Sequence, residues 1–228
     1  MLKKLPLTLQ STTLWDYPSQ HYGSKMQGSQ FYQGATPSYI IWNLLTRYTR
    51  DNDLIVDPMC GSGTTIDVCC DLKRRVSGYD IAPFRKDMIK ADARNLPLDK
   101  DQADFVFVDP PYSDHLQYSQ EEECIGRIKA EDPLYFEEME KVIKEIHRIL
   151  KPRRYMGLYI CDSYKKKSGF VPIGFKMFEI LCRYFKPIDI IAVTRHNKSL
   201  QKSQWKKAAL EGNFYLRGFN YLFIMKKE

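Results

Sequence analysis

Short apolar runs that alternate with helix-like patterns constrain the fold of this chain more than any other feature. Between these runs, apolar residues recur at helical spacing, as at Ile41, Leu44 and Tyr48. Strands that alternate with helices indicate an α/β fold with a doubly wound, mostly parallel sheet. No strong helix separates the last two runs, so we expect the last strand to be antiparallel. The predicted strands are residues 54–56, 75–80, 88–90, 105–108, 155–161, 188–193 and 221–225, and the predicted helices are residues 37–49, 64–72, 136–150 and 175–184.

The 228 residues fit one domain with small insertions. Residues 1–35 are polar and aromatic with little periodicity, so we expect an N-terminal arm or loops there. Thr36 is a candidate N-cap, because Pro37 would then occupy the first helical position. Residues 36–228 are expected to form the main domain, with loop insertions near 113–132 and 195–212. A further basic loop is expected at 163–170.

The composition favours an intracellular protein that binds a polyanion. The net charge of +7 favours nucleic acid as a partner through counterion release. No apolar window is long enough for a membrane span, and the N-terminus does not resemble a secretion signal, so we expect a cytoplasmic protein without membrane contact. The 6 cysteines form no CxxC pair and the 4 histidines are scattered. Reduced thiols and no metal site are therefore expected.

Acidic residues follow three of the predicted strands. Asp57, Asp80 and Asp109 lie at or just beyond strand ends. In an open α/β sheet, ligands bind outside the carboxyl ends of the strands. The three carboxylates are therefore expected to share one site.

The segment 57–65, Asp-Pro-Met-Cys-Gly-Ser-Gly-Thr-Thr, is the first part of that site. Gly61 and Gly63 allow a sharp turn and close approach to a ligand, and the following helix offers N–H groups to a carboxylate. A phosphate loop would end in Gly-Lys-Ser/Thr, and a nicotinamide fingerprint would have glycine where Ile66 stands. The carboxylate of Asp57 suits S-adenosylmethionine, which carries an ammonium and a sulfonium.

Two further acids suit the rest of this cofactor. Asp80 follows Asp57 at close to the roughly 20-residue spacing at which an acid reaches the ribose hydroxyls. The carboxylate of Asp92 and the backbone N–H of Ala93 could together read an adenine ring.

The segment Asp109-Pro110-Pro111-Tyr112 is the strongest signal for chemistry. The two prolines fix the backbone and remove two hydrogen-bond donors, which leaves a cluster of acceptors. Tyr112 adds an aromatic face. Acceptors beside a stacking surface suit a flat base that carries an amino group.

The two motifs together, Asp-Pro-x-Cys-Gly-Ser-Gly-Thr and then Asp-Pro-Pro-Tyr, resemble those of the amino-methyltransferases of nucleic acids. This class includes N6-adenine and N4-cytosine DNA methyltransferases and guanine-N2 RNA methyltransferases. The resemblance covers residues 34–162 well and the C-terminal part more loosely. It implies a Rossmann-like class I methyltransferase fold, with residues 36–228 as the catalytic domain.

The resemblance also implies the roles of individual residues. The segment 61–65 would hold the methionine part of the cofactor, with Asp57 near its ammonium, Asp80 at the ribose and Asp92 at the adenine. The implied catalytic residues are Asp109, Pro110, Pro111 and Tyr112. The implied cofactor-binding residues are Thr36, Asp57, Met59, Cys60, Gly61, Gly63, Thr64, Thr65, Asp80, Ile81, Asp92 and Ala93.

The motifs do not fix the substrate. Asp-Pro-Pro-Tyr favours DNA, with adenine N6 preferred over cytosine N4, and guanine N2 in tRNA or other RNA is the alternative. The base must be flipped or single-stranded, and Tyr112 would stack on it. Target recognition could lie in residues 1–33, 113–132 and 195–217, in a homodimer or in a separate partner. The candidate contacts to nucleic acid are Lys165, Lys166, Lys167, Arg195, Lys198, Lys202 and Trp205.

A non-catalytic nucleic-acid-binding module on the same scaffold is the alternative of another kind. Such a module would be expected to lack the catalytic acid or the glycines of the cofactor loop. Asp109, Gly61 and Gly63 are all present, which favours an enzyme.

Overall fold

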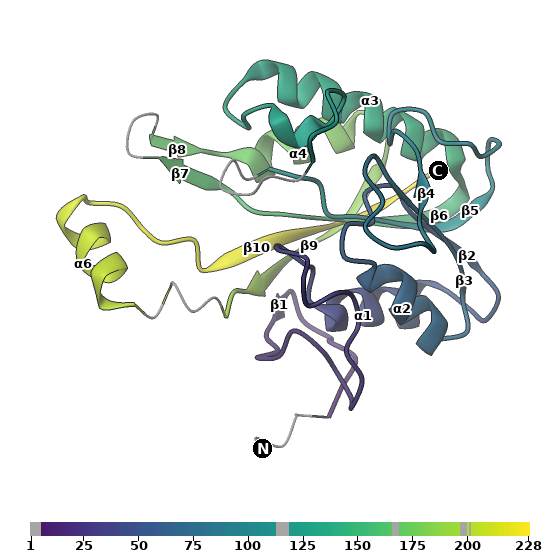
Figure 1. The fold of residues 1–228 in the computed structure, drawn as a ribbon, viewed down its shortest axis with the longest axis horizontal. Coiled ribbons are helices and arrows are strands. Elements are labelled where there is room, and N and C mark those ends of the chain that lie inside the picture. The colour runs from purple at the N-terminus through teal and green to yellow at the C-terminus, as the bar shows by residue number, and fades with distance from the viewer. Residues whose placement is uncertain (1–5, 113–118, 166–168, 197–199, 201) are drawn as a thin grey trace.

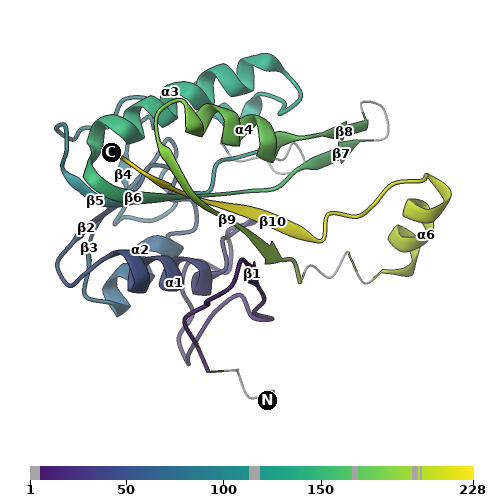
Figure 2. The same ribbon diagram turned by 180° about the vertical axis from the view of Figure 1, so that it is seen from behind.

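The computed structural model describes residues 6–112, 119–165, 169–196, 200 and 202–228. An eight-stranded sheet with the order β1-β9-β10-β6-β5-β2-β3-β4 forms its centre, with helices on both faces (Figures 1 and 2). None of the described helices is long and apolar enough to cross a bilayer. The strands of this sheet are β1 (Leu14–Trp15), β2 (Leu54–Asp57), β3 (Arg75–Asp80), β4 (Ile89–Lys90), β5 (Ala103–Val108), β6 (Leu150–Ile160), β9 (Lys186–Thr194) and β10 (Phe219–Lys226).

The strand directions confirm a doubly wound, mostly parallel sheet with an antiparallel last strand. β2 to β6 pair in parallel, and β1 pairs in parallel with β9. β10 lies between β6 and β9 and is antiparallel to both. Because β10 is reversed, its first residues reach the same edge of the sheet as the carboxyl ends of its neighbours.

Helices bury both faces of the sheet. α1 (Ser38–Tyr48) and α2 (Thr64–Asp71) cover one face, and α3 (Pro133–Ile149) and α4 (Ile173–Cys182) cover the other (Figure 1). Phe105 and Phe107 of β5 belong to the core under α1, whereas Val106 and Val108 belong to the core under α3 and α4. A strand buried on both sides reads as a continuous apolar run, which is why β5 is recognisable in the sequence.

Several predicted boundaries differ from those of the structure, and two of them, in β6 and β4, have a clear physical reason. Strand β6 begins directly after α3 and runs through Pro152, where a break had been expected. The pairing of β5 with β6 shifts register here, and Arg153 has a φ of 62°. Such an irregularity accommodates a proline within a strand. Strand β4 contains only Ile89 and Lys90, because Met88 turns into a small separate core instead.

The predicted basic loop at 163–170 instead contains a hairpin of β7 (Ser163–Lys165) and β8 (Gly169–Val171). The predicted insertion at 195–212 contains a helix, α6 (Ser203–Glu211), and the described part of 113–132 contains a 3₁₀ turn, η1 (Ile125–Arg127). The hairpin and α6 extend from the same side of the sheet (Figure 1). The rings of Tyr164 and Phe214 stack 4.3 Å apart and link the hairpin to the chain that follows α6.

The N-terminal arm is attached to the core. Residues 14–15 add strand β1 to the edge of the sheet. Trp15 and Tyr17 are buried in the core under α1. The arm therefore has a fixed course along this face, and it returns to the sheet edge at residue 36.

A buried lysine closes the opposite edge of the sheet. Lys227 is 5% exposed, and its ammonium donates to the carboxylate of Asp101 at 2.6 Å. It also donates to the backbone carbonyls of His147 and Leu150 at 2.6 and 2.7 Å. One cation therefore satisfies acceptors at the end of α3, the start of β6 and the turn before β5.

We expect Lys227→Met to lower the free energy of unfolding by about 1–3 kcal/mol, because it leaves buried acceptors without a donor. Thermal melts would show this as a fall of about 2–4 °C in the midpoint for each 1 kcal/mol in a domain of this size. The control is Lys186→Met, since Lys186 is exposed and pairs with Glu228 at the surface. Equal midpoints for the two variants would contradict this role of Lys227.

Candidate active site

A cavity of about 790 Å³ lies at the carboxyl ends of β2, β3, β5 and β6. Residues from the arm, the strand ends and the start of β10 line it. The residues expected from the sequence that line this cavity are Thr36, Asp57, Met59, Cys60, Gly61, Thr64, Thr65, Asp80, Ile81, Asp92, Ala93, Asp109, Pro110, Pro111, Tyr112, Lys165 and Arg195.

The glycine loop between β2 and α2 has two residues in the left-handed region. Gly61 has a φ of 48°, and a Cβ there would lie 3.0 Å from the ring of Tyr32. Gly63 has a φ of 80° and caps the N-terminus of α2. Gly63 is not among the residues at the cavity wall. It shapes the turn, whereas Gly61 borders the cavity directly.

Asp57 is buried at the end of β2. Its carboxylate accepts hydrogen bonds from the backbone N–H of Met59 at 3.1 Å and from the hydroxyl of Thr65. Burial raises the pKa of Asp57 to about 7, although these hydrogen bonds favour the ionised form.

Asp80 holds the loops on both sides of its own strand end. It accepts from the backbone N–H of Gly61 at 2.8 Å and from that of Ala82 at 2.9 Å. Burial raises its pKa. The carboxylate of Asp80 therefore holds the glycine loop in place. Asp80 also lines the cavity.

Asp92 has a cationic partner that the sequence did not reveal. The guanidinium of Arg94 contacts both oxygens of Asp92, the shortest contact being 2.6 Å, and it also binds Glu138. Burial acts to raise the pKa of Asp92, but the hydrogen bonds from Arg94 outweigh it and hold the pKa below its usual range. Asp92 is thus an ionised acceptor in a fixed orientation.

Asp109 extends from β5 into the cavity and is bound by the arm. The hydroxyl of Thr36 donates to its Oδ2 at 2.6 Å. The prediction that Thr36 caps α1 is wrong, because Pro37 occupies the N-cap position and the hydroxyl is used for Asp109. Burial raises the pKa of Asp109 to about 7, and the nearby charge of Asp57 adds to this effect.

Tyr159 was missed by the sequence reasoning. The parallel register pairs Val108 with Leu158, so Tyr159 lies beside Asp109 one residue further along. Tyr159 is buried and lines the cavity. Burial, with the nearby charge of Asp109, raises the pKa of its phenol well above the usual range. Only the pairing register of β6 could have placed it here.

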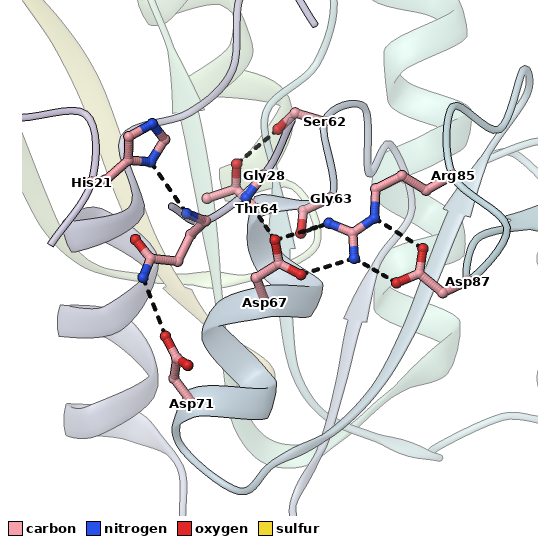
Figure 3. A network of polar contacts seen from close by, with 10 residues as sticks. His21, Gly28, Ser62, Gly63, Thr64, Asp67, Asp71, Arg85 and Asp87 are labelled. Atoms are coloured by element: carbon pink, nitrogen blue, oxygen red, sulfur yellow. Dashed lines mark hydrogen bonds and ion pairs between the residues drawn. The ribbon is translucent and has the colours of Figure 1, made fainter. Parts of the chain in front are cut away.

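The arm is tied to the glycine loop and α2 by the polar network of Figure 3. The backbone N–H of Gly28 donates to Asp67 at 2.7 Å, and the side chain of Gln27 donates to Asp71 at 3.3 Å. Arg85 makes a two-point contact with the same Asp67 at 2.8 and 2.9 Å. The arm thereby closes one side of the cavity.

The candidate nucleic-acid contacts divide into three groups. Lys165 and Arg195 line the cavity; Lys165 pairs with Glu131 at 2.5 Å, and Arg195 donates to the thiol of Cys161 at 3.2 Å. Lys202 and Trp205 lie at the start of α6, away from the cavity wall. Lys166, Lys167 and Lys198 lie outside the described residues. Within the described ranges, no cluster of His, Cys, Asp and Glu could hold a metal ion.

The sequence matches the family model described as DNA methylase over residues 4–91 and 103–228. No curated protein matches the chain.

Solved structures share the fold at low sequence identity. An S-adenosylmethionine-dependent methyltransferase from Methanosarcina mazei is 15% identical, covers 81% of this chain and 96% of its own, and has a TM-score of 0.50. TrmN from Thermus thermophilus is 15% identical with a TM-score of 0.56, covering 86% of this chain and 50% of its own. Geranyl diphosphate C-methyltransferase from Streptomyces coelicolor A3(2), solved with S-adenosyl-L-homocysteine, is 14% identical with a TM-score of 0.56, covering 84% and 79%.

These neighbours show a methyltransferase fold, and the family match extends over most of the chain. The protein therefore belongs to the DNA methylase family of S-adenosylmethionine-dependent methyltransferases that act on nucleic acids.

Proposed function

We propose that the protein methylates the exocyclic amino group of a base in DNA, with adenine N6 as the preferred target over cytosine N4. The observation that carries this proposal is the position of Asp109. Its carboxylate is half-buried at the end of β5, in the same cavity as Asp57 and Asp80. Guanine N2 in RNA is the alternative that the test below separates.

The carboxylates of the cavity suit a positively charged cofactor. Within the described part of the chain, the hydrogen bonds to Asp57, Asp80 and Asp109 come from neutral hydroxyl and backbone N–H groups. Asp57 is buried and the other two are half-buried. Carboxylates removed from water without a cationic partner favour a cationic ligand. S-adenosylmethionine supplies an activated methyl group on its sulfonium.

The roles within this cofactor site are those that the resemblance to the amino-methyltransferases implies. Asp57 would face the ammonium, Asp80 the ribose hydroxyls and Asp92 the adenine. Thr65 and Gly61 orient the first two carboxylates through the hydrogen bonds described above. The glycine loop would therefore both contact the cofactor and hold the carboxylates of Asp57 and Asp80 in place.

The amino group of a base is a poor nucleophile because its lone pair is delocalised into the ring. Hydrogen bonds from its two N–H groups to Asp109 and to the carbonyl of Pro110 would localise the lone pair and direct it at the methyl group. Thr36 binds Oδ2 of Asp109, which leaves Oδ1 to receive the amino group. Methylation of a ring carbon would need a cysteine nucleophile, and residues 109–112 contain none.

Proton loss from the product needs no strong base, since a methylated ammonium is acidic. The ionised form of Asp109 is nevertheless required, because a protonated carboxyl would replace an acceptor by a donor. Tyr112 would stack on the base, which must leave the duplex to reach the cavity. Lys165 and Arg195 at the cavity wall are the described candidates for contacts to the flanking phosphates.

The main test is transfer of a labelled methyl group to DNA and to RNA, followed by digestion to nucleosides. We expect N6-methyladenine in DNA from the wild type. Asp109→Ala should lower kcat by about 10²–10³-fold, the loss typical of one electrostatic contact to the reacting group, a larger change than that in the Kd for S-adenosylmethionine. Exposed Asp99 provides the control variant Asp99→Ala. Wild-type rates for Asp109→Ala would contradict the proposal. Detection of methylated guanine in RNA would identify RNA, and not DNA, as the substrate.

Thr36→Val tests the hydrogen bond to Asp109. This bond favours the ionised carboxylate, so its loss should raise the pKa of Asp109 further. The acid limb of the profile of kcat/KM against pH is therefore expected to move to higher pH, with a larger loss at pH 6 than at pH 8.5. The control is Thr46→Val, since Thr46 lies further along α1. An unshifted acid limb in Thr36→Val would exclude this role.

The raised pKa values of Asp57 and Asp109 also predict how stability depends on pH. Between their usual pKa near 3.8 and the folded value of about 7, the folded state binds more protons than the unfolded state. Stability of the cofactor-free protein should therefore fall as pH rises through this window.

Asp109→Asn removes one of these charges. We expect it to raise the thermal midpoint at pH 8 by at least about 2–4 °C, the change that 1 kcal/mol makes in a domain of this size. At pH 4 the variant and the wild type should melt alike. Asp99→Asn serves as the matched control, and the same offset at both pH values would refute the burial argument.

A further inference from the structure

Helix α6 is exposed on nearly all sides. Of its 9 residues, only Ala209 is buried. The helix and the hairpin of β7 and β8 extend beyond the sheet on the same side (Figures 1 and 2). A helix this short is only marginally stable in water by itself, because most helical stability in proteins comes from packing. The exposure of α6 therefore indicates a surface that a partner covers.

Side-chain contacts connect α6 to the cavity. The backbone N–H of Phe214 donates to the carbonyl of Ala209 at 3.0 Å, so the chain folds back after the helix. The ring of Phe214 stacks on Tyr164 of the hairpin, and Tyr164 lines the cavity. Further along, the guanidinium of Arg217 lies 5.2 Å from the centre of the Phe170 ring, and Arg217 also lines the cavity. The contacts thus hold α6 and the hairpin next to the cavity wall.

Exposed rings and cations lie together in this part of the molecule. Trp205 is 47% exposed, Phe170 is 50% exposed and Tyr215 is 86% exposed. Lys202 and Lys206, on either side of Trp205 in the chain, are also exposed. Exposed rings interleaved with cations are typical of proteins that bind single-stranded nucleic acid. We define the α6 surface as the aromatic residues Phe170, Trp205 and Tyr215 and the cations Lys202, Lys206 and Arg217.

The positive charge of the chain is concentrated in the two segments that contribute to the α6 surface. Residues 163–171 contain three Lys and no acid, and residues 195–219 contain six Lys and Arg and one acid, Glu211. The net charge of the two segments together is therefore +8, whereas that of the whole chain is +7. The other residues carry a net charge of −1. Attraction for a polyanion is thus a property of these segments and not of the chain as a whole.

We propose that the α6 surface binds the nucleotides that flank the target base, with bases stacked on its three rings and phosphates held by its three cations. This inference rests on the proposed function, in which the target base must leave the duplex to enter the cavity. Nucleotides next to a flipped base lose a stacking partner, and the exposed rings replace it. Every base has a face that can stack, so the α6 surface supplies affinity without reading the sequence.

Trp205→Ala and Tyr215→Ala test the stacking. The probe is a fluorescently labelled single-stranded oligodeoxynucleotide of mixed sequence, and its Kd is measured by fluorescence anisotropy without cofactor. We expect each variant to raise this Kd by about 5–150-fold, the range for losing one stacked base. Trp205→Phe and Tyr215→Phe keep a ring, so they should recover most of the affinity.

Leu210→Ala is the matched control within α6. Leu210 is 83% exposed, and alanine has a higher helix propensity than tryptophan or leucine, so neither substitution weakens the helix. We expect Leu210→Ala to bind the probe as the wild type does, because Leu210 has no ring. Equal losses of affinity in Leu210→Ala and Trp205→Ala would overturn the stacking.

The double variant Lys202→Gln/Lys206→Gln tests the phosphate contacts. The slope of log Kd against log salt concentration should decrease by about 0.7 for each phosphate contact that is lost. Lys100→Gln/Lys186→Gln removes the same net charge from the opposite edge of the sheet, in the turn before β5 and at the start of β9. The slope of this control should match the wild type. Equal slopes in the two double variants would contradict the assignment of the contacts to α6.

Hydrogen exchange of α6 gives a readout that is independent of affinity. The amides of residues 203–211 should exchange rapidly in the free protein, because the helix has little buried surface. Adding the unlabelled oligodeoxynucleotide should slow their exchange, whereas the amides of α3 should be unaffected. Unchanged exchange in α6 at saturating probe would overturn the inference.

The experiments separate this inference from the proposed function. If the wild type binds the probe through the α6 surface but transfers no methyl group, the proposed function fails and the binding surface stands. If the protein methylates DNA or RNA and the α6 variants keep the wild-type Kd and KM for that substrate, the inference fails and the proposed function stands. An RNA probe of the same sequence distinguishes the two sources of the strand.

A second copy of this chain is the other occupant that could cover α6. Sedimentation of the wild type and of Trp205→Ala tests this possibility. We expect the same oligomeric state for both proteins. Loss of a wild-type dimer in Trp205→Ala, with no change in the Kd for the probe, would identify a subunit interface and overturn the inference.

Discussion

The pairing of one buried and one half-buried carboxylate at the ends of adjacent strands is the constraint on which the rest of the site depends. Asp57 and Asp109 extend β2 and β5, and the parallel pairing of these strands brings them to one edge of the sheet. Each carboxylate is held by a threonine hydroxyl, from Thr65 and Thr36 respectively. Neutral donors orient the charges without cancelling them. The edge therefore keeps a negative potential that a cationic methyl donor can use.

The arm makes this edge into a cavity. It supplies Thr36 to Asp109, and it is anchored at its middle to α2 through Gly28 and Asp67 (Figure 3). Arg85 holds Asp67 from the other side, so the arm, the glycine loop and the chain after β3 share one network. Asp109 and the first turns of α2 are thus held by a segment that lacks regular structure over most of its length.

The sequence was informative where function depends on local position. In a parallel sheet, an acid that directly follows a strand lies at the carboxyl edge. The sequence therefore sufficed to predict that Asp57, Asp80 and Asp109 share one site. Tyr159 and Asn220 could not, because their positions depend on strand register and on the reversed direction of β10. Thr36 was predicted to cap a helix because the sequence shows the adjacent helix but not the distant carboxylate of Asp109, which binds the hydroxyl instead. The hairpin of β7 and β8 was missed because a basic segment gives little strand signal.

The reversed strand β10 brings the C-terminal segment to the cavity that the other strand ends form. The groups expected to meet the cofactor precede residue 94, whereas Arg217 and Asn220 enter the cavity from the C-terminal segment. Substitutions near the start of β10 can therefore reshape one wall of the cavity while the segments expected to hold the cofactor stay unchanged. A cavity lined from two distant stretches of chain can vary on one side without loss of the other.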